Sequence, residues 1–181
     1  ERSMTVSDAE FKSVLGRFPT GVTVVTTCDG ERPAGVTVNA FASVSLRPPL
    51  VMVCIDKRSH LHDLVAQSGF FVANILGAHQ QELSRRFAGQ TGDRNERFRQ
   101  TPYHLGVTGA PVLDGVLAHV ECRVLAIYPG GDHSIFLGQV EAMGATAGEP
   151  LAYYRARYGA LDMLDLLDMD ADAGVAPGRR E

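Results

Sequence analysis

The chain has 181 residues, 45% hydrophobic and 21% charged, with a formal net charge of -4 at pH 7. This predicts one domain with a stable core of its own, and the acidic balance argues against a nucleic-acid surface. No apolar run approaches the roughly 20 residues of a membrane-spanning helix, while three scattered cysteines and the absence of a signal-peptide pattern at Glu1 favour a cytoplasmic protein.

A short helix is predicted close to the start of the chain. Ser7 and Glu10 have the spacing of a capping box, in which each side chain accepts a hydrogen bond from the backbone amide of the other residue. Pro19 closes the segment. Apolar residues recur at helical spacing at Phe11, Val14, Leu15 and Phe18, so we expect an amphipathic helix with a structural role.

The next segments predict a β-hairpin. Residues 21–27 form a β-branched strand, and Asp29-Gly30 is a turn signal that leads into a second strand over 36–46. In that second strand the even positions are all apolar and face the predicted core. The odd positions carry Thr37, Asn39, Phe41, Ser43 and Ser45, which fits either a face that binds a ligand or one that lies under a loop.

Two prolines after Arg47 end this strand, and a third strand follows. Residues 50–55 are apolar throughout, which predicts burial on both faces. Asp56-Lys57-Arg58-Ser59 then precedes a helix over 60–68, with Ser59 as N-cap and Gly69 as the stop. Two cations at a capped helix start indicate either an anion site or a solvated basic turn.

The remaining elements are predicted by the same patterns. A strand covers 70–76, and a helix covers 81–88 with Glu82 and Arg86 as an ion pair. Residues 89–103 are polar and predict a mobile surface loop or lid. Two further strands, 116–127 and 133–143, form an antiparallel pair around the turn at 129–132.

In the first strand of that pair the even positions are apolar, and the opposite face carries His119, Glu121 and Arg123. Residues 150–155 form a short aromatic and basic segment. An acidic amphipathic stretch follows Leu161, and we expect the end of the chain to be disordered. The chain therefore divides into a domain over 1–161 and a tail over 162–181.

The fold class that these elements favour is a mainly β, antiparallel β-barrel with short helices. The alternating strand and helix order of a Rossmann fold and its G-x-G-x-x-G motif are both missing from the sequence. His60 and His62 lack a partner at metal-ligand spacing, so we expect no metal site. Asp132-His133 at a glycine turn fits either a binding or catalytic histidine or an aspartate that caps its own turn.

Three motifs occur in order: T-V-N-A-F-A-S-V-S-L-R-P-P-L from Thr37, C-I-D-K-R-S from Cys54, and G-D-H-S-I-F-L-G from Gly131. Together they resemble the short-chain flavin reductase family, the NAD(P)H:flavin oxidoreductases that serve two-component monooxygenases. The resemblance covers about 11–161. It implies an FMN-binding split β-barrel of Greek-key-like order that forms a homodimer, with the flavin near the dimer interface.

The resemblance also assigns residues to the two nucleotides. It places Thr37, Asn39, Ala40 and Phe41 along the flavin ring and Ser43 and Ser45 beside the ribityl phosphate. It places Lys57 and Ser59 on the phosphate and makes Arg86 a second phosphate or dinucleotide contact. It assigns the nicotinamide nucleotide to Gly131, Asp132 and His133, with Tyr154 closing the site.

The activity so implied is hydride transfer from NADH or NADPH to FMN, with FAD as the alternative, and diffusion of reduced flavin to a monooxygenase. Because the two nucleotides supply this chemistry, the protein needs no acid, base or nucleophile of its own. Two other functions remain open: an oxidoreductase that keeps its flavin and acts on its own substrate, and a barrel that binds flavin without turnover.

Overall fold

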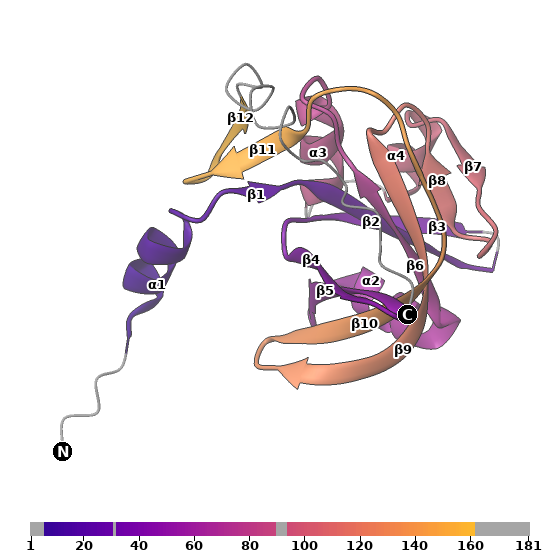
Figure 1. Cartoon of the computed structure of the whole chain (residues 1–181), viewed down its shortest axis with the longest axis horizontal. Helices are drawn as coiled ribbons and strands as arrows, with labels where there is room; N and C mark the ends of the chain where they lie inside the picture. Colours follow the sequence, from indigo (N-terminus) through magenta and orange to yellow (C-terminus); the bar gives the residue numbers. More distant parts are fainter. Residues whose placement is uncertain (1–5, 31, 90–93, 162–181) are drawn as a thin grey trace, which may run out of the picture.

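A curled antiparallel β-sheet forms the body of the protein in the computed structural model, which describes residues 6–30, 32–89 and 94–161 (Figure 1). Its seven strands run in the order β3-β2-β6-β9-β10-β5-β4. Their bounds are β2 Thr23–Asp29, β3 Arg32–Val38, β4 Phe41–Leu46, β5 Pro49–Asp56, β6 Phe70–Ile75, β9 Ala118–Gly130 and β10 His133–Ala145. The predicted mainly β, antiparallel class with short helices is confirmed.

The two edge strands of this sheet, β3 and β4, are adjacent in sequence, with only Asn39 and Ala40 between them. Such a short connection brings the two edges together, and the sheet curls accordingly (Figure 1). At the junction, the amide of Cys54 in β5 donates to the carbonyl of Ala40 at 3.0 Å.

The prediction of one continuous strand over 36–46 is therefore wrong. β3 pairs with β2 in the expected hairpin, around Gly30 at φ +58, but β4 leaves it and pairs with β5. The predicted core face fails in β4 as well. Val44 and Leu46 are 51% and 90% exposed, while Phe41, on the opposite face in the predicted alternation, packs against the core.

Two small sheets complete the β-structure. β1 (Thr20–Gly21), β11 (Leu151–Tyr154) and β12 (Arg157–Ala160) form one, and β7 (Tyr103–Leu105) and β8 (Pro111–Leu113) form the other. The segment after Pro150 is thus a hairpin, β11–β12, whose turn residues Arg155 and Ala156 both have positive φ.

The helices α2 (His60–Ser68) and α3 (Gln81–Ala88) have the predicted bounds. Ser59 caps α2, and Gly69 ends it in the left-handed conformation at φ +76. No helix among the described residues has the length and apolar character needed to cross a membrane.

The helix α1 (Asp8–Leu15) has the predicted capping box at Ser7 and Glu10, but it buries none of its residues. It projects from the body of the molecule (Figure 1). Its attachment includes a hydrogen bond from the amide of Arg155 to the carbonyl of Gly16. The apolar face of α1 is therefore exposed.

The segment after α3 is not the predicted loop in its described part. It contains the helix α4 (Arg94–Arg99), and Phe98 is buried against Phe87 of α3 with ring centroids 5.2 Å apart. The predicted Glu82–Arg86 pair is also wrong, because Arg86 donates to the carbonyl of Gln100 at 2.8 Å and so holds the end of α4.

The predicted burial of two other strands needs correction. In β5, Val51, Val53 and Ile55 are buried, but the alternate residues are only half-buried, so the strand has one core face. In β9, Glu121 is 3% exposed and its carboxylate accepts from the amide and hydroxyl of Thr108, both at 3.0 Å. A buried carboxylate with two donors has a structural role.

Candidate functional site

A pocket of about 450 Å³ lies between β3, the start of α2 and the helices α3 and α4. This volume is within the usual range for small-molecule sites. The pocket combines apolar walls with charged and polar groups. It is lined by Ala34, Gly35, Val36, Thr37, Asp56, Arg58, Ser59, His60, Leu61, Ala88, Gly89, Arg97 and Phe98.

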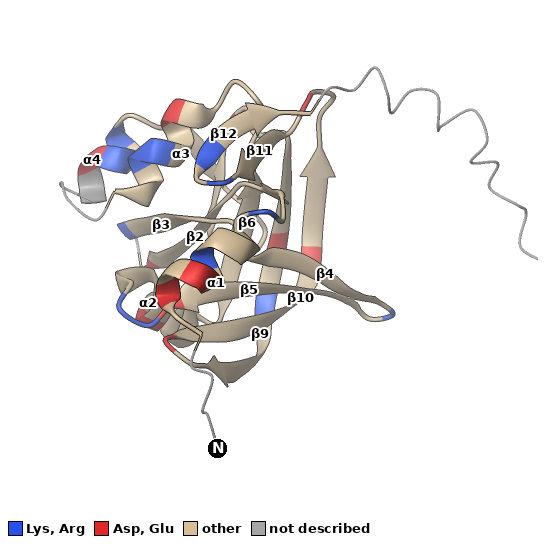
Figure 2. Ribbon diagram, turned by 90° about the vertical axis from the view of Figure 1, so that its left-hand side faces the viewer, with Lys and Arg blue, Asp and Glu red and all other residues tan. Residues whose placement is uncertain are grey.

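Basic residues occur on the elements that form this pocket. In Figure 2 the ribbon is blue at lysine and arginine positions on α3, on α4 and on the loop before α2, with β3 between the two groups. Arg58 lines the pocket from the loop, and Arg97 lines it from α4. The charged side chains of the pocket lining are therefore two arginines and one carboxylate, that of Asp56.

The start of α2 supplies the polar end of the pocket. The hydroxyl of Ser59 accepts from the amide of Leu61 at 3.3 Å, which makes Ser59 the helix cap. Free amides and the helix dipole at this position attract an anion. Of the basic run at 57–58, Arg58 lines the pocket beside Ser59, and its side chain is 82% exposed and paired with Asp56. Both predicted alternatives, an anion site and a solvated basic turn, fit this arrangement.

Asp56 organises this loop. Its carboxylate accepts from the amide of Arg58 at 2.8 Å and from the guanidinium at 2.7 Å. These hydrogen bonds from Arg58 hold the pKa of the Asp56 carboxyl far below its usual range. The carboxylate in turn raises the pKa of Arg58, so both groups are charged around neutral pH.

The glycine turn after β9 lies directly against the same loop. The Lys57 ammonium donates to the carbonyl of Gly131 at 2.6 Å, and the Lys57 amide donates to the carbonyl of Asp132 at 3.0 Å. His133 lies opposite Asp56 across the β10–β5 ladder. The structure thus brings the residues predicted for the flavin phosphate and for the nicotinamide nucleotide together.

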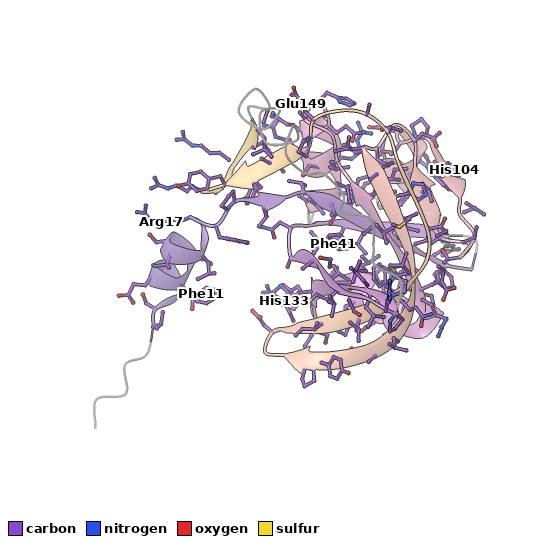
Figure 3. The ribbon with its side chains drawn as sticks, viewed as in Figure 1. Phe11, Arg17, Phe41, His104, His133 and Glu149 are labelled. Carbon is purple, nitrogen blue, oxygen red and sulfur yellow. The ribbon has the colours of Figure 1, made fainter. Side chains whose placement is uncertain are left out.

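His133 has a defined ring orientation in this turn. Its Nδ1 is hydrogen-bonded to the carboxylate of Asp132 at 2.8 Å, and this bond lowers the pKa of the Asp132 carboxyl. The side chain is 41% exposed. Figure 3 shows His133 and Phe41 on the side of the molecule from which α1 projects.

The residues predicted along the flavin ring lie in three settings. Thr37 lines the pocket, but its hydroxyl donates to the carbonyl of Ser84 at 2.6 Å and so joins β3 to α3. Asn39 and Ala40 are exposed at the strand junction, and Phe41 is half-buried against the core.

Ser43 and Ser45 are not brought to the start of α2. Ser43 lies opposite Val51 and Ser45 opposite Leu50, whereas Asp56 is at the other end of β5. Five residues of strand, roughly 16 Å, separate Val51 from Asp56. Both serines therefore lie apart from the predicted phosphate site at Ser59, and their place beside the ribityl-phosphate side of the flavin stays a prediction.

Arg86 and Tyr154 also lie outside the pocket lining. The guanidinium of Arg86 is engaged by Gln100 and by the hydroxyl of Thr101 at 2.9 Å. Tyr154 is 44% exposed at the end of β11. Neither position supports the nucleotide contact predicted for it.

Several lining residues were missed by the sequence analysis. Arg97 and Phe98 lie in the segment that was predicted to be a loop, and Ala34, Gly35 and Val36 precede the first motif. Gly35 permits a close approach, because a Cβ there would lie 3.0 Å from the ring of Phe87. A glycine and an arginine in such settings carry no local signal that could have identified them. No group of three potential metal ligands occurs among the described residues.

Comparisons with known proteins agree with the family resemblance of the three sequence motifs. Residues 15–162 match the model of the flavin reductase like domain. The chain is 36% identical over 163 residues to the reductase subunit HsaB of a flavin-dependent monooxygenase from Mycobacterium tuberculosis, covering 88% of this chain and 86% of that protein. It is 37% identical to an NADH-dependent flavin reductase from a Rhodococcus species, covering 88% and 89% of the two chains.

A solved structure extends the similarity to three dimensions. The NADH:FAD oxidoreductase SgcE6 from Streptomyces globisporus, in complex with NAD and FAD fragments, superimposes with a TM-score of 0.79. The two chains are 39% identical, and the match covers 84% of this chain and 92% of that one. The architecture is therefore that of the split-barrel type.

Proposed function

The chain belongs to the flavin reductase like family, and on this premise we propose that it is an NAD(P)H:flavin oxidoreductase. It transfers a hydride from a reduced nicotinamide to FMN or FAD and supplies the reduced flavin to a partner monooxygenase. The observation that carries this proposal is a match over nearly the whole described chain to relatives named flavin reductases. The names of the relatives favour NADH as the donor.

The site fits a nucleotide phosphate. The capped start of α2, Ser59 and the guanidinium of Arg58 form a donor set suited to a phosphate, next to the apolar walls of the pocket. We assign the flavin phosphate to these groups and the nicotinamide to the turn that carries His133. The bound flavin supplies the electron chemistry, while these residues bind and orient the two substrates.

We further propose that the protein acts as a homodimer. On the outer face of β5 and β10, Met52, Cys54, Ile135 and Leu137 form a half-buried apolar group, with Met52 opposite Leu137 and Cys54 opposite Ile135. The apolar face of α1 is exposed on the same molecule. Apolar side chains that a single chain leaves partly or fully exposed favour association with a partner, and a second copy is the one that the family implies.

We assign the protein to the cytoplasm, which supplies reduced nicotinamide and keeps thiols reduced. Cys28, Cys54 and Cys122 are all free. Burial raises the pKa of each of these thiols, that of Cys122 to about 12, so none is activated as a nucleophile. Free, unactivated thiols fit a reducing compartment.

Anaerobic stopped-flow mixing tests the activity. The protein with excess FMN or FAD is mixed with NADH or NADPH, and flavin absorbance is followed. We expect many flavins to be reduced per protein. Reduction that stops at one flavin per protein would instead indicate a flavoprotein with its own substrate, and flavin binding without reduction by either donor would indicate a non-catalytic binder.

A further inference from the structure

We propose that Lys57 is a positioning residue for the nicotinamide turn and not a ligand of the flavin phosphate. It ties the turn at Gly131 and Asp132 to the loop before α2 and thereby sets the position of His133. This inference rests on the proposed function for its kinetic consequences, but the contacts themselves can be tested without it.

Lys57 makes two hydrogen bonds to consecutive carbonyls of the turn. Its Nζ is 2.6 Å from the carbonyl oxygen of Gly131, and its amide nitrogen is 3.0 Å from that of Asp132. Both bonds come from one residue, so the turn is held in one orientation relative to Asp56 and Arg58.

The turn needs such an external restraint. Gly130, Gly131 and Asp132 are all exposed, and Gly131 adopts φ +73, a conformation in which glycine is favoured because it has no Cβ. Two glycines at the tip of a hairpin leave the backbone loose, since little side-chain packing limits it. The ammonium of Lys57 provides a charged donor to this backbone.

The next residues are fixed by a separate contact. His62, in the first turn of α2, is hydrogen-bonded through Nε2 to the hydroxyl of Ser134 at 2.9 Å. The ring of His62 also packs edge-on against Phe136 with centroids 5.3 Å apart. Ser134 is buried, so the start of β10 is already fixed to α2 and only the tip depends on Lys57.

The orientation of His133 follows from these contacts. The ammonium of Lys57 holds the carbonyl of Gly131, directly before Asp132, and the carboxylate of Asp132 holds the imidazole of His133 at 2.8 Å. Loss of the Lys57 ammonium frees the Gly131 carbonyl and allows the tip to move. The pocket at the start of α2 keeps its lining, because Arg58 and Ser59 line it and Lys57 does not.

The test compares Lys57→Met, Lys57→Arg and the control Arg123→Met, which removes a positive charge from an exposed site on β9, outside the pocket lining. We expect Lys57→Met to raise the KM for NADH by roughly three- to tenfold, which is within the range for the net loss of one ordinary hydrogen bond. The affinities for FMN and riboflavin, measured by fluorescence titration, should keep their ratio. Lys57→Arg should recover most of the loss, and Arg123→Met should change neither quantity.

Amide hydrogen exchange of residues 130–133 gives a second measurement that needs no activity. Lys57→Met should exchange faster there, while the amides of α2 stay as in the unsubstituted protein. A selective loss of FMN affinity with riboflavin unchanged would overturn the proposal and make Lys57 a phosphate ligand. Unchanged exchange and KM would also overturn it, leaving a surface lysine. Absence of any NADH-driven flavin reduction by the unsubstituted protein would reject the proposed function, while the exchange measurement would still decide the contact.

Discussion

Single residues in this protein carry more than one role, and Asp56 is the clearest case. It ends β5, lies opposite His133, binds Arg58 and lines the pocket. The ionised carboxylate of Asp56 holds the loop before α2 in place through its hydrogen bonds to Arg58. The proposed contacts with the flavin phosphate and with the nicotinamide both depend on the position of this loop.

Asp56→Asn should lower stability at neutral pH and leave it unchanged in acid. The pKa of Asp56 in the folded protein lies below its ordinary value of 3.8. The stabilising effect is therefore fully present above pH 3.8 and is lost as the pH falls through the folded pKa. Urea unfolding of the unsubstituted protein and of Asp56→Asn from pH 7 to pH 2 measures this stabilising effect. The difference between their unfolding free energies should shrink only below about pH 4.

Glu82→Gln provides the matched control, since Glu82 is exposed and its ion pair with Arg85 spans 3.9 Å. Such a pair contributes little. If the difference in unfolding free energy between Asp56→Asn and the unsubstituted protein stays constant down to pH 2, the prediction is wrong. The loss of stability would then come from the changed hydrogen-bonding geometry of the side chain and not from its lost charge.

Gly138 shows that a motif residue need not touch a ligand. It ends the run G-D-H-S-I-F-L-G, but it lies inside the barrel. A Cβ at this position would come within 2.7 Å of the ring of Phe71 and 2.8 Å of the Cβ of Cys122. Close packing explains this glycine, whereas the first three residues of the run form the exposed turn.

At the scale of elements, the sequence predicted the helix ends that are set by nearby residues, but not the strand ends that are set by pairing with distant parts of the chain. The bounds of α2 follow from a cap at Ser59 and a stop at Gly69, which act within the helix itself. The break at Asn39 and Ala40 could not be predicted in this way. Alternation continues across it, and only the pairing of β4 with β5, which lies elsewhere in the chain, determines where β3 ends.

The helix α4 was missed for a related reason. Its six residues, R-N-E-R-F-R, contain one apolar side chain, Phe98, too few for a helical period. The partners of Phe98 are Phe87 and Tyr103, with ring centroids at 5.2 and 5.4 Å. Tertiary contact thus holds a helix that its own pattern does not indicate. The turn of β11–β12 at Arg155 and Ala156 lacks a glycine signal in the same way.

Phe98→Ala should destabilise the protein by about 3–5 kcal/mol, the usual cost of removing a buried phenyl group. Urea unfolding measures this loss. Because Phe98 also lines the pocket, flavin affinity should fall, while Phe98→Leu should retain most of both quantities. The control Leu105→Ala, at a side chain that is 63% exposed, should change neither. Unfolding at the same urea concentration as the unsubstituted protein would mean that α4 is not anchored by this ring.

At the scale of the whole molecule, one chain leaves apolar surface uncovered in two places. The first is the α1 face, made of Phe11, Val14, Leu15 and Phe18, each more than half exposed. The second is the outer face of β5 and β10. The helix α1 buries none of its residues against its own chain, so its apolar face contributes little to the stability of the monomer. Such a face favours packing against a second copy of the chain.

The double variant Phe11→Glu, Phe18→Glu should weaken the proposed dimer. Stable interfaces bury roughly 800 Å² on each partner, and charges placed in such an interface must lose their water. Light scattering after size exclusion should give twice 19.5 kDa for the unsubstituted protein and a mass nearer the monomer for the variant.

Val107→Glu is the control for that variant, because Val107 is 76% exposed between β7 and β8, outside both apolar faces. It adds a charge to an exposed apolar position and should leave the mass unchanged. Since α1 contributes nothing to the core, the double variant should also keep the circular dichroism of the barrel. A monomeric unsubstituted protein at micromolar concentration would contradict the dimer, and a dimeric double variant would place its interface on β5 and β10 alone.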